Sequence, residues 1–372
     1  MNNHKTLQVF LNERKVGTLA ATPDYRVAFE YATPWLTEGF SISPLSLPLE
    51  KGVFMPKSYE PFEGLFGVFA DSLPDGWGRL LLDRMLSREK INPAQISSLD
   101  RLAIVGSSGM GAMEYRPESE LSLDASDLSL DELAMESEKI MESRQSDNLD
   151  EIFRLGGSSG GARPKVYYQM EGREWIVKFP SSFDGGDIGE QEYNYSLCAK
   201  KCGIEMPETR LLPSKLNAGY FAVERFDRKN GQKIHMLSAG GMLETSHRIP
   251  NLDYRILMRL TMKVTGDYGE IEKLYRQMCF NVFAHNRDDH AKNFSYLYED
   301  DRWRLSPAYD LTYSNSIGGE HATTVDGNGR DPGREELLAV AKDIKLDRRR
   351  AERIASEIQE IVCTDLNYYL NP

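Results

Sequence analysis

The chain has 372 residues, of which 40% are hydrophobic and 27% are charged, and its formal net charge is −12. This composition is typical of a globular protein with a sizeable core, and the length predicts two or three domains. No apolar run reaches the ~18 residues of a membrane-spanning helix, and the first residues lack the apolar centre of a secretory signal. We therefore expect a cytoplasmic protein that does not associate with membranes.

The four cysteines also fit a reducing compartment. Cys198 and Cys202 lie four residues apart within a helical pattern, which is the spacing of half a metal site. No second Cys or His pair follows at a ligand spacing, so we interpret them as buried thiols.

Residues 1–115 have the pattern of a small β-rich module. The sequence LQVFLNERKVGTLAA alternates apolar and polar residues on either side of Asn12-Glu13, which predicts an opening hairpin. Pro74-Asp75-Gly76 indicates a turn, and an apolar helical pattern follows from Trp77. The glycine-rich stretch VGSSGMGAMEY closes the module.

The negative charge is concentrated in the next segment. Glu118 to Glu151 contain twelve acidic and two basic residues, so the rest of the chain is close to neutral. Ser129 and Glu132 have the spacing of a capping box, and the apolar residues that follow predict a helix over about 130–144. We interpret residues 116–150 as an acidic helical connector exposed to solvent.

The remaining chain has the layout of a two-lobed nucleotide enzyme. Strand-like runs (KVYYQM, WIVKFP, YFAVERF) alternate with one helical pattern (QEYNYSLCAKKCG), and after about residue 250 the chain becomes mostly helical. We predict an α+β, two-lobed protein-kinase-like fold with the N-terminal β-rich module added. Its nucleotide-binding N-lobe is expected at 151–228, and its mostly helical C-lobe, with the catalytic loop, at 229–372.

The segment from His285 to Thr312 carries the strongest chemical signal. FSYLY and WRLSPA flank a polar turn, so a hairpin is expected to bring Asn293 and Asp310 side by side, with Asp288 one short loop away. An amide oxygen and a carboxylate suit Mg²⁺, and Asp288 remains free to accept the proton of an attacking hydroxyl. The spacing Asp-x4-Asn is that of the protein-kinase catalytic loop. The alternative is a polar surface loop whose acids cap a helix and a turn.

A glycine- and serine-rich loop, RLGGSSGGARPK at 154–165, precedes a predicted strand. Glycines allow the backbone to approach phosphates, and successive N–H groups can hold them. We therefore expect Gly160, Gly161, Ala162 and Arg163 to bind the nucleotide. The loop lacks the Gly-Lys-Ser/Thr of a Walker motif, and a flexible connector is the alternative.

Lys178 lies among apolar strand residues in WIVKFP, where a lysine must either reach solvent or meet an anion. A nucleotide phosphate is such an anion, and Glu192 on the following helix is a possible orienting partner. The alternative is a lysine on an exposed strand face. The stretch FAVERFDR at 221–228 has the pattern of a strand that leads into a connection between lobes.

Together these motifs resemble one family. FADSLPDGWGR, VGSSGMGAMEY, AVERFDR, DDHAKNFS and YDL are similar to segments of HipA-type kinases, the toxins of bacterial toxin–antitoxin pairs. The resemblance covers most of the chain. It implies an ATP- and Mg²⁺-dependent serine/threonine kinase with catalytic Asp288, with Asn293 and Asp310 on the metal and with Lys178 on the phosphates. It further implies that Glu224 and Phe226 present backbone groups to adenine. His290 would lie near the phosphates, or else would only order its loop.

Regulation and partners follow from the same resemblance. Autophosphorylation of a glycine-loop serine, Ser158 or the adjacent Ser159, would displace that loop. The expected partner is a small helix-turn-helix antitoxin (HipB-like), and the chain would contact DNA only through this antitoxin. The expected substrate is a translation protein such as an aminoacyl-tRNA synthetase. Asp310-Leu311-Thr312 departs from the Asp-Phe-Gly of protein kinases, so no kinase-style activation switch is expected. The competing hypothesis is a catalytically silent scaffold that acts as a co-repressor with the DNA-binding partner.

Overall fold

The computed structural model describes residues 4–119, 123 and 127–370, and it divides into two compact units. The first unit comprises Met1–Gly189, Leu212–Leu237 and Gly241–Glu244, and the second comprises Glu190–Leu211, Ser238–Gly240 and Thr245–Pro372. The chain passes between them within α7 (Ile188–Lys201), β8 (Thr209–Leu212), β12 (His235–Ser238) and α8 (Ala239–Leu243). Residues 1–115 and most of the expected N-lobe lie in the first unit, but Glu190–Leu211 of that lobe belong to the second. The boundaries at 115, 150 and 228 remain predictions.

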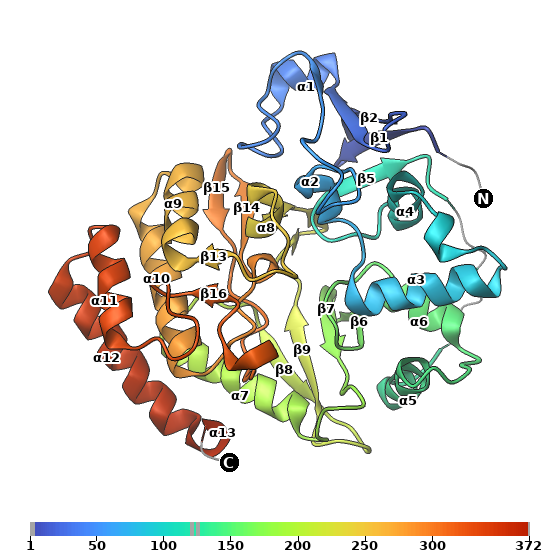
Figure 1. The fold of residues 1–372 in the computed structure, drawn as a ribbon. Coiled ribbons are helices and arrows are strands. Elements are labelled where there is room, and N and C mark those ends of the chain that lie inside the picture. Colours follow the sequence, from blue (N-terminus) through green and yellow to red (C-terminus); the bar gives the residue numbers. More distant parts are fainter. Residues whose placement is uncertain (1–3, 120–122, 124–126, 371–372) are drawn as a thin grey trace. The chain divides into compact units, whose positions relative to one another are not determined.

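An antiparallel sheet with the order β4-β3-β2-β1-β5 forms the N-terminal part of the first unit (Figure 1). Its strands are β1 (Thr6–Leu11), β2 (Arg14–Ala21), β3 (Val27–Tyr31), β4 (Val53–Phe54) and β5 (Met113–Arg116). Leu11 pairs with Arg14, and Asn12 and Glu13 between them have positive φ angles of 46° and 66°. Two such residues make the tight turn whose twist suits a hairpin, so the predicted hairpin is confirmed.

Short helices accompany this sheet. They are α1 (Thr33–Glu38), α2 (Gly67–Ala70), α3 (Gly76–Arg88) and α4 (Ser98–Val105), with a 3₁₀ turn at Pro93–Gln95. The helix α3 begins directly after Pro74-Asp75, as predicted. Its apolar stripe, including Trp77 and Leu81, is buried and belongs to the core of the unit. The turn and its helix therefore connect the N-terminal module with the strands that follow.

The acidic segment contains α5 (Leu130–Met141), and α6 (Leu149–Gly156) follows it. The predicted capping box of Ser129 and Glu132 is present, which confirms the start of α5. The solvent-exposed connector that we expected is wrong for this helix, because Leu133 and Ile140 are buried in the core. The Asp131 carboxylate also accepts a hydrogen bond of 2.8 Å from the Tyr220 hydroxyl. Residues 120–122 and 124–126 of the connector lie outside the described residues.

A second antiparallel sheet completes the first unit through β6 (Lys165–Met170), β7 (Arg173–Lys178) and β9 (Tyr220–Glu224). Val166, Val177 and Ala222 lie opposite one another in this sheet and are buried beside α5 and α6. A small ribbon of β10 (Arg228–Lys229) and β11 (Gln232–Lys233) follows β9.

The second unit is mostly helical, as predicted for the C-lobe. Its helices are α9 (Tyr254–Thr265), α10 (Tyr268–Phe283), α11 (Arg334–Asp343), α12 (Arg348–Asp365) and α13 (Asn367–Leu370). Its strands are β13 (Leu252–Asp253), β14 (Ser295–Glu299), β15 (Arg302–Leu305) and β16 (Thr323–Thr324), with 3₁₀ turns at Ala291–Asn293 and Ile317–Gly319. Figure 1 shows α10 beside α9 and α12, which both pack on it. Among the described residues, no helix combines the length and apolarity needed to cross a bilayer.

The helical part has two further local features. Cys198 of α7 and Cys202, directly after the end of that helix, are buried free thiols, which confirms their interpretation, and the described residues contain no cluster of metal-ligating side chains. Asp347 accepts a hydrogen bond of 2.9 Å from the Arg350 N–H and so caps α12.

Candidate functional site

The expected catalytic loop lies between α10 and β14 in the second unit. The helix ends at Phe283, and His285 adopts a left-handed conformation with a φ of 52°, which turns the chain away from the helix. The Asp288 side chain is 60% exposed. The buried Asn293 donates its side-chain N–H to the Asp288 carbonyl oxygen at 2.7 Å. Asn293 therefore fixes the backbone of Asp288 and leaves the carboxylate facing solvent.

The side chain of His290 orders the same loop. Its Nδ1 accepts a hydrogen bond of 3.2 Å from the Lys292 N–H and caps the 3₁₀ turn Ala291–Asn293. When the ring is neutral, its proton is therefore on Nε2, which lies 3.9 Å from an Asp288 carboxylate oxygen. Of the two roles that we expected for His290, the structure shows the loop-ordering one, and contact with phosphates remains a prediction.

The hairpin of β14 and β15 brings the Asn293 and Asp310 segments together. Its turn lies at Asp300 and Asp301, and beyond its paired strands the Ser306 N–H donates to the Ser295 carbonyl oxygen at 2.8 Å. The Tyr309 hydroxyl donates to the Lys292 carbonyl oxygen at 2.5 Å. Residues directly preceding Asn293 and Asp310 are thus hydrogen-bonded to each other, which confirms the hairpin.

Asp310 has a left-handed backbone, with a φ of 52°. This conformation is uncommon outside glycine, and Asp tolerates it better than most residues. The side chain is half-buried. Asp300 and Asp301 in the turn of the same hairpin share this conformation, so it does not by itself mark a functional position.

In the first unit the glycine-rich loop is hydrogen-bonded to the turn before α3 and to the start of β6. The Trp77 N–H donates to the Gly161 carbonyl oxygen at 2.8 Å, and the Asp75 carboxylate accepts a hydrogen bond from the Gly161 N–H. The Lys165 ammonium donates to the Gly160 carbonyl oxygen at 2.5 Å. The turn before α3 therefore holds this loop, and the Asp75 carboxylate occupies the Gly161 N–H. Phosphate binding by the loop remains a prediction.

The remaining loop residues differ in exposure. Ser159 is buried, with its hydroxyl on the Gly156 carbonyl oxygen at 2.6 Å. Ser158 is less buried and donates to the Ser108 carbonyl oxygen at 2.9 Å. Ala162 is exposed. Arg163 forms an ion pair of 3.0 Å with Asp184, which draws its guanidinium toward the segment after β7.

Lys178 is the last residue of β7, where it pairs with Lys165 on one side and with Phe221 on the other. The lysine is half-buried, and its ammonium lies 5.6 Å from the centre of the Phe221 ring. Glu192 lies on α7 in the second unit, so its pairing with Lys178 remains a prediction.

The segment after β9 is held by a buried charge network. The Asp227 carboxylate binds the guanidinium groups of Arg225 at 2.8 Å and Arg228 at 2.9 Å. Burial alone would raise the pKa of Asp227, but the two guanidinium groups outweigh it and lower that pKa from 3.8 to about 2. Asp227 therefore stays ionised and fixes the stretch that contains Glu224 and Phe226.

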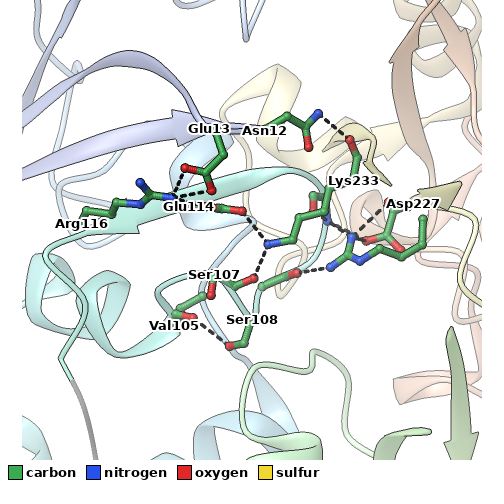
Figure 2. Close-up of polar contacts among 12 residues, drawn as sticks. Asn12, Glu13, Val105, Ser107, Ser108, Glu114, Arg116, Asp227 and Lys233 are labelled. Carbon is green, nitrogen blue, oxygen red and sulfur yellow. Dashed lines mark hydrogen bonds and ion pairs between the residues drawn. The ribbon is translucent and has the colours of Figure 1, made fainter. Parts of the chain in front are cut away.

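The same network reaches the glycine-rich stretch of the N-terminal module. The Asp227 carboxylate accepts a hydrogen bond of 2.7 Å from the Gly111 N–H, and Arg228 donates to the Gly109 carbonyl oxygen at 3.0 Å. Figure 2 shows Lys233 reaching both the Ser107 carbonyl oxygen, at 2.6 Å, and the Glu114 carboxylate, at 2.8 Å. The expected adenine-binding segment is thus anchored to residues 107–114.

The predicted site residues therefore fall into two groups. Asp288, His290, Asn293 and Asp310 lie on one loop and hairpin of the second unit, whereas the glycine-rich loop, Lys178, Glu224 and Phe226 lie in the first. That the two groups form one site remains a prediction. Sequence reasoning missed three buried or anchoring acids, Asp75, Asp227 and Asp289. Asp75 lies in a Pro-Asp-Gly turn, whereas Asp227 and Asp289 lie in strongly polar stretches, and no spacing along the chain marks the three as anchors.

The fold defines the class of the protein. The chain is similar to the HipA chain in a complex of HipA, HipB and operator DNA from Shewanella oneidensis MR-1, with a TM-score of 0.72. The two are 17% identical, and the match covers 98% of this chain and 90% of that one. This likeness confirms the predicted α+β, two-lobed kinase-like fold.

The family follows from the sequence matches. The model of the HipA-like C-terminal domain matches residues 157–365, and that of the HipA N-terminal domain matches residues 7–116. The chain belongs to the HipA family. Two relatives from Sinorhizobium fredii are "Putative kinase Y4dM", 30% identical over 154 residues, and "Putative kinase Y4mE", 25% identical over 342 residues. The first match spans 38% of this chain and 37% of that relative, and the second spans 82% and 77%.

Proposed function

We propose that this HipA-family chain is an ATP-dependent serine/threonine protein kinase of the toxin type. The observation that carries the proposal is the hairpin that joins the segments of Asn293 and Asp310 beside the exposed carboxylate of Asp288. This is the set of groups that phosphoryl transfer to a hydroxyl requires. The kinase names of the two relatives support the same reaction.

The residues of the second unit fit Mg²⁺. Asn293 uses its amide nitrogen on the Asp288 carbonyl, which leaves the amide oxygen as its group for a cation. Asp310 adds a carboxylate, and both are the hard oxygen ligands that Mg²⁺ prefers. The ion would screen the charge of the phosphates.

The residues of the first unit fit the nucleotide. The hydrogen bond of the Gly161 N–H to the Asp75 carboxylate supports a loop that directs a donor at an anion. We propose that Gly160, Gly161, Ala162 and Arg163 bind the phosphates with Lys178. The network of Asp227 holds the backbone of Glu224 and Phe226, which we assign to adenine.

In the reaction, Asp288 would accept the proton of a serine or threonine hydroxyl while the hydroxyl oxygen forms a bond to the γ-phosphorus. The bond between that phosphorus and the oxygen of ADP breaks, and ADP leaves with the electron pair. His290 orders the loop of Asp288 and, in this proposal, lies near the phosphates.

Regulation and partners belong to the same proposal. Ser158 and Ser159 are the proposed autophosphorylation sites, and a phosphate on Ser158 would remove its donor bond to the Ser108 carbonyl oxygen. The HipB in the complex of the Shewanella protein supports a HipB-like antitoxin partner, with DNA met only through it. We propose a translation protein such as an aminoacyl-tRNA synthetase as substrate.

The test measures transfer from γ-labelled ATP, with Mg²⁺, to the purified full chain and to proteins of a bacterial lysate. Asp288→Asn should lower the transfer rate by about 10²–10⁴-fold, the usual effect of losing a positioned proton acceptor. Asp300→Asn is the matched control, because it changes an exposed acid at the tip of the β14–β15 hairpin, which follows the loop of Asp288. Nucleotide binding by the wild type without any transfer would favour the silent co-repressor scaffold.

Growth provides a second readout. Expression without the antitoxin should arrest cells, and Asp310→Gln should relieve the arrest. Equal arrest by both proteins would show that toxicity does not require phosphoryl transfer.

A further inference from the structure

A chain of four buried polar side chains brackets the proposed catalytic aspartate. The Asn286 amide donates to the Asn281 side-chain oxygen at 3.0 Å, and the Asn281 amide donates to the Tyr254 hydroxyl at 2.9 Å. Tyr254 in turn donates to the Asp289 carboxylate at 2.9 Å. Each of the four is at most 2% exposed. We call these four residues the loop clamp.

The clamp joins both sides of Asp288 to helices. Asn286 lies two residues before Asp288 and is held from α10 through Asn281, whereas Asp289 directly follows it and is held from α9 through Tyr254. The two ends meet at one hydroxyl, so the loop is closed into a ring of hydrogen bonds. A shift of either helix side chain is therefore transmitted to the backbone of Asp288.

Asp289 has further partners that point away from solvent. Its carboxylate accepts hydrogen bonds from the His321 ring at 3.0 Å and from the Thr323 N–H at 3.1 Å. The Ala322 N–H donates to the Arg287 carbonyl oxygen at 3.0 Å. The segment at 321–323, which leads into β16, therefore holds the loop from a third direction.

The adjacent acids, Asp288 and Asp289, have opposite environments. The Asp288 side chain is 60% exposed, whereas that of Asp289 is fully buried with donors on each side. Burying a carboxylate is costly unless its hydrogen bonds are made, and the Asp289 carboxylate has three donors, from Tyr254, His321 and Thr323. Burial and the nearby carboxylate raise the pKa of Tyr254 well above its ordinary value, so the tyrosine remains a donor.

We propose that Asp289 and Tyr254 are positioning residues for phosphoryl transfer, which hold Asp288 through the loop clamp. This inference rests on the proposed kinase function and assigns roles beyond the groups that contact nucleotide or metal. A base displaced by a fraction of an ångström loses much of its rate advantage, while nucleotide binding in the other unit depends on other residues. Loss of the clamp should thus lower kcat and leave the KM for ATP nearly unchanged.

The test compares Tyr254→Phe with Tyr296→Phe. Tyr296 is the matched control, since it is equally buried and its hydroxyl bonds at 2.8 Å to Thr261, on the same helix as Tyr254. Each variant should lower the melting temperature by a few degrees, and by a similar amount. Only Tyr254→Phe should lower kcat, by about 10–100-fold, with the KM for ATP within about twofold of the wild type.

A double-variant cycle provides a second measurement. Asp289→Asn should also lower kcat, and Tyr254→Phe combined with it should fall little further, because both act through one hydrogen-bonded chain. Equal kcat values for the two tyrosine variants would overturn the proposal that the loop clamp positions Asp288. Losses of kcat that multiply in the double variant would overturn it as well. If the wild type itself transfers no phosphate while it binds ATP, the proposed function fails instead, and the two failures are distinguishable.

Discussion

The buried carboxylate of Asp227 offers a prediction with a magnitude. We expect Asp227→Asn to destabilise the first unit, because it leaves the guanidinium of Arg225, only 4% exposed, without its charged partner. The fall in the pKa of Asp227 from 3.8 to about 2 corresponds to roughly 2 kcal/mol in favour of the folded state at neutral pH. Removing one partner of a buried ion pair generally costs about 3–5 kcal/mol. We therefore expect a loss of about 2–5 kcal/mol at pH 7.

The sign of the pH dependence follows from the same pKa. The folded state lowers the pKa of Asp227. The contribution of Asp227 to the free energy of unfolding is therefore complete well above pH 3.8 and is lost as the pH falls through about 2. It should be about half as large at pH 3 as at pH 7. The stability difference between the wild type and Asp227→Asn should therefore narrow as the solution becomes more acidic.

Urea unfolding followed by tryptophan fluorescence measures this difference. Trp35, Trp77 and Trp175 are buried in the first unit, so a Trp303→Phe background makes the signal specific for that unit. The control is Asp24→Asn, whose exposed ion pair with Arg26 should leave the urea midpoint nearly unchanged. An Asp227→Asn protein as stable as the wild type at pH 7, or a difference that widens toward pH 3, would refute the reasoning.

Three further predictions concern the first unit. Asp75→Asn should lower the KM for ATP severalfold in a transfer assay, because it removes a negative charge from the Gly161 N–H and keeps an acceptor there; an increase would contradict the phosphate assignment. Gly78→Ala should raise that KM, because its Cβ would lie 2.2 Å from the Ser159 carbonyl oxygen and would displace the loop; a wild-type KM in a folded variant would argue against it. Leu133→Ala should cost about 2–5 kcal/mol in urea unfolding, because α5 packs in the core; no loss would mean that the helix is only a connector.

Local patterns predicted much of the fold. The turn at Asn12-Glu13, the capping box at Ser129 and the hairpin before Asp310 each depend on residues a few positions apart, and each was found where expected. The exposed face that we assigned to α5 was wrong, because the charge of a segment does not show which of its residues pack inward. Acidic residues surround a narrow apolar stripe in that helix.

The contacts that fix the site could not be predicted in the same way. The hydrogen bonds of Asp75 to the glycine-rich loop, of Asp227 to Gly111 and of Tyr254 to Asp289 join residues 86, 116 and 35 positions apart. Such pairs depend on how sheets and helices pack, and no spacing rule along the chain indicates them. The proposed catalytic motifs are therefore visible in the sequence, whereas the residues that hold them in place are not.

The metal assignment at Asn293 and Asp310 is the centre of the account. Its most direct measurement is the binding of Mn²⁺, as a stand-in for Mg²⁺, to the full chain with a non-hydrolysable ATP analogue, followed by electron paramagnetic resonance. We predict one Mn²⁺ per chain with the wild type and with the hairpin control Asp301→Asn, and at least tenfold weaker binding with Asp310→Asn. Equal Mn²⁺ affinity in all three proteins would contradict the assignment.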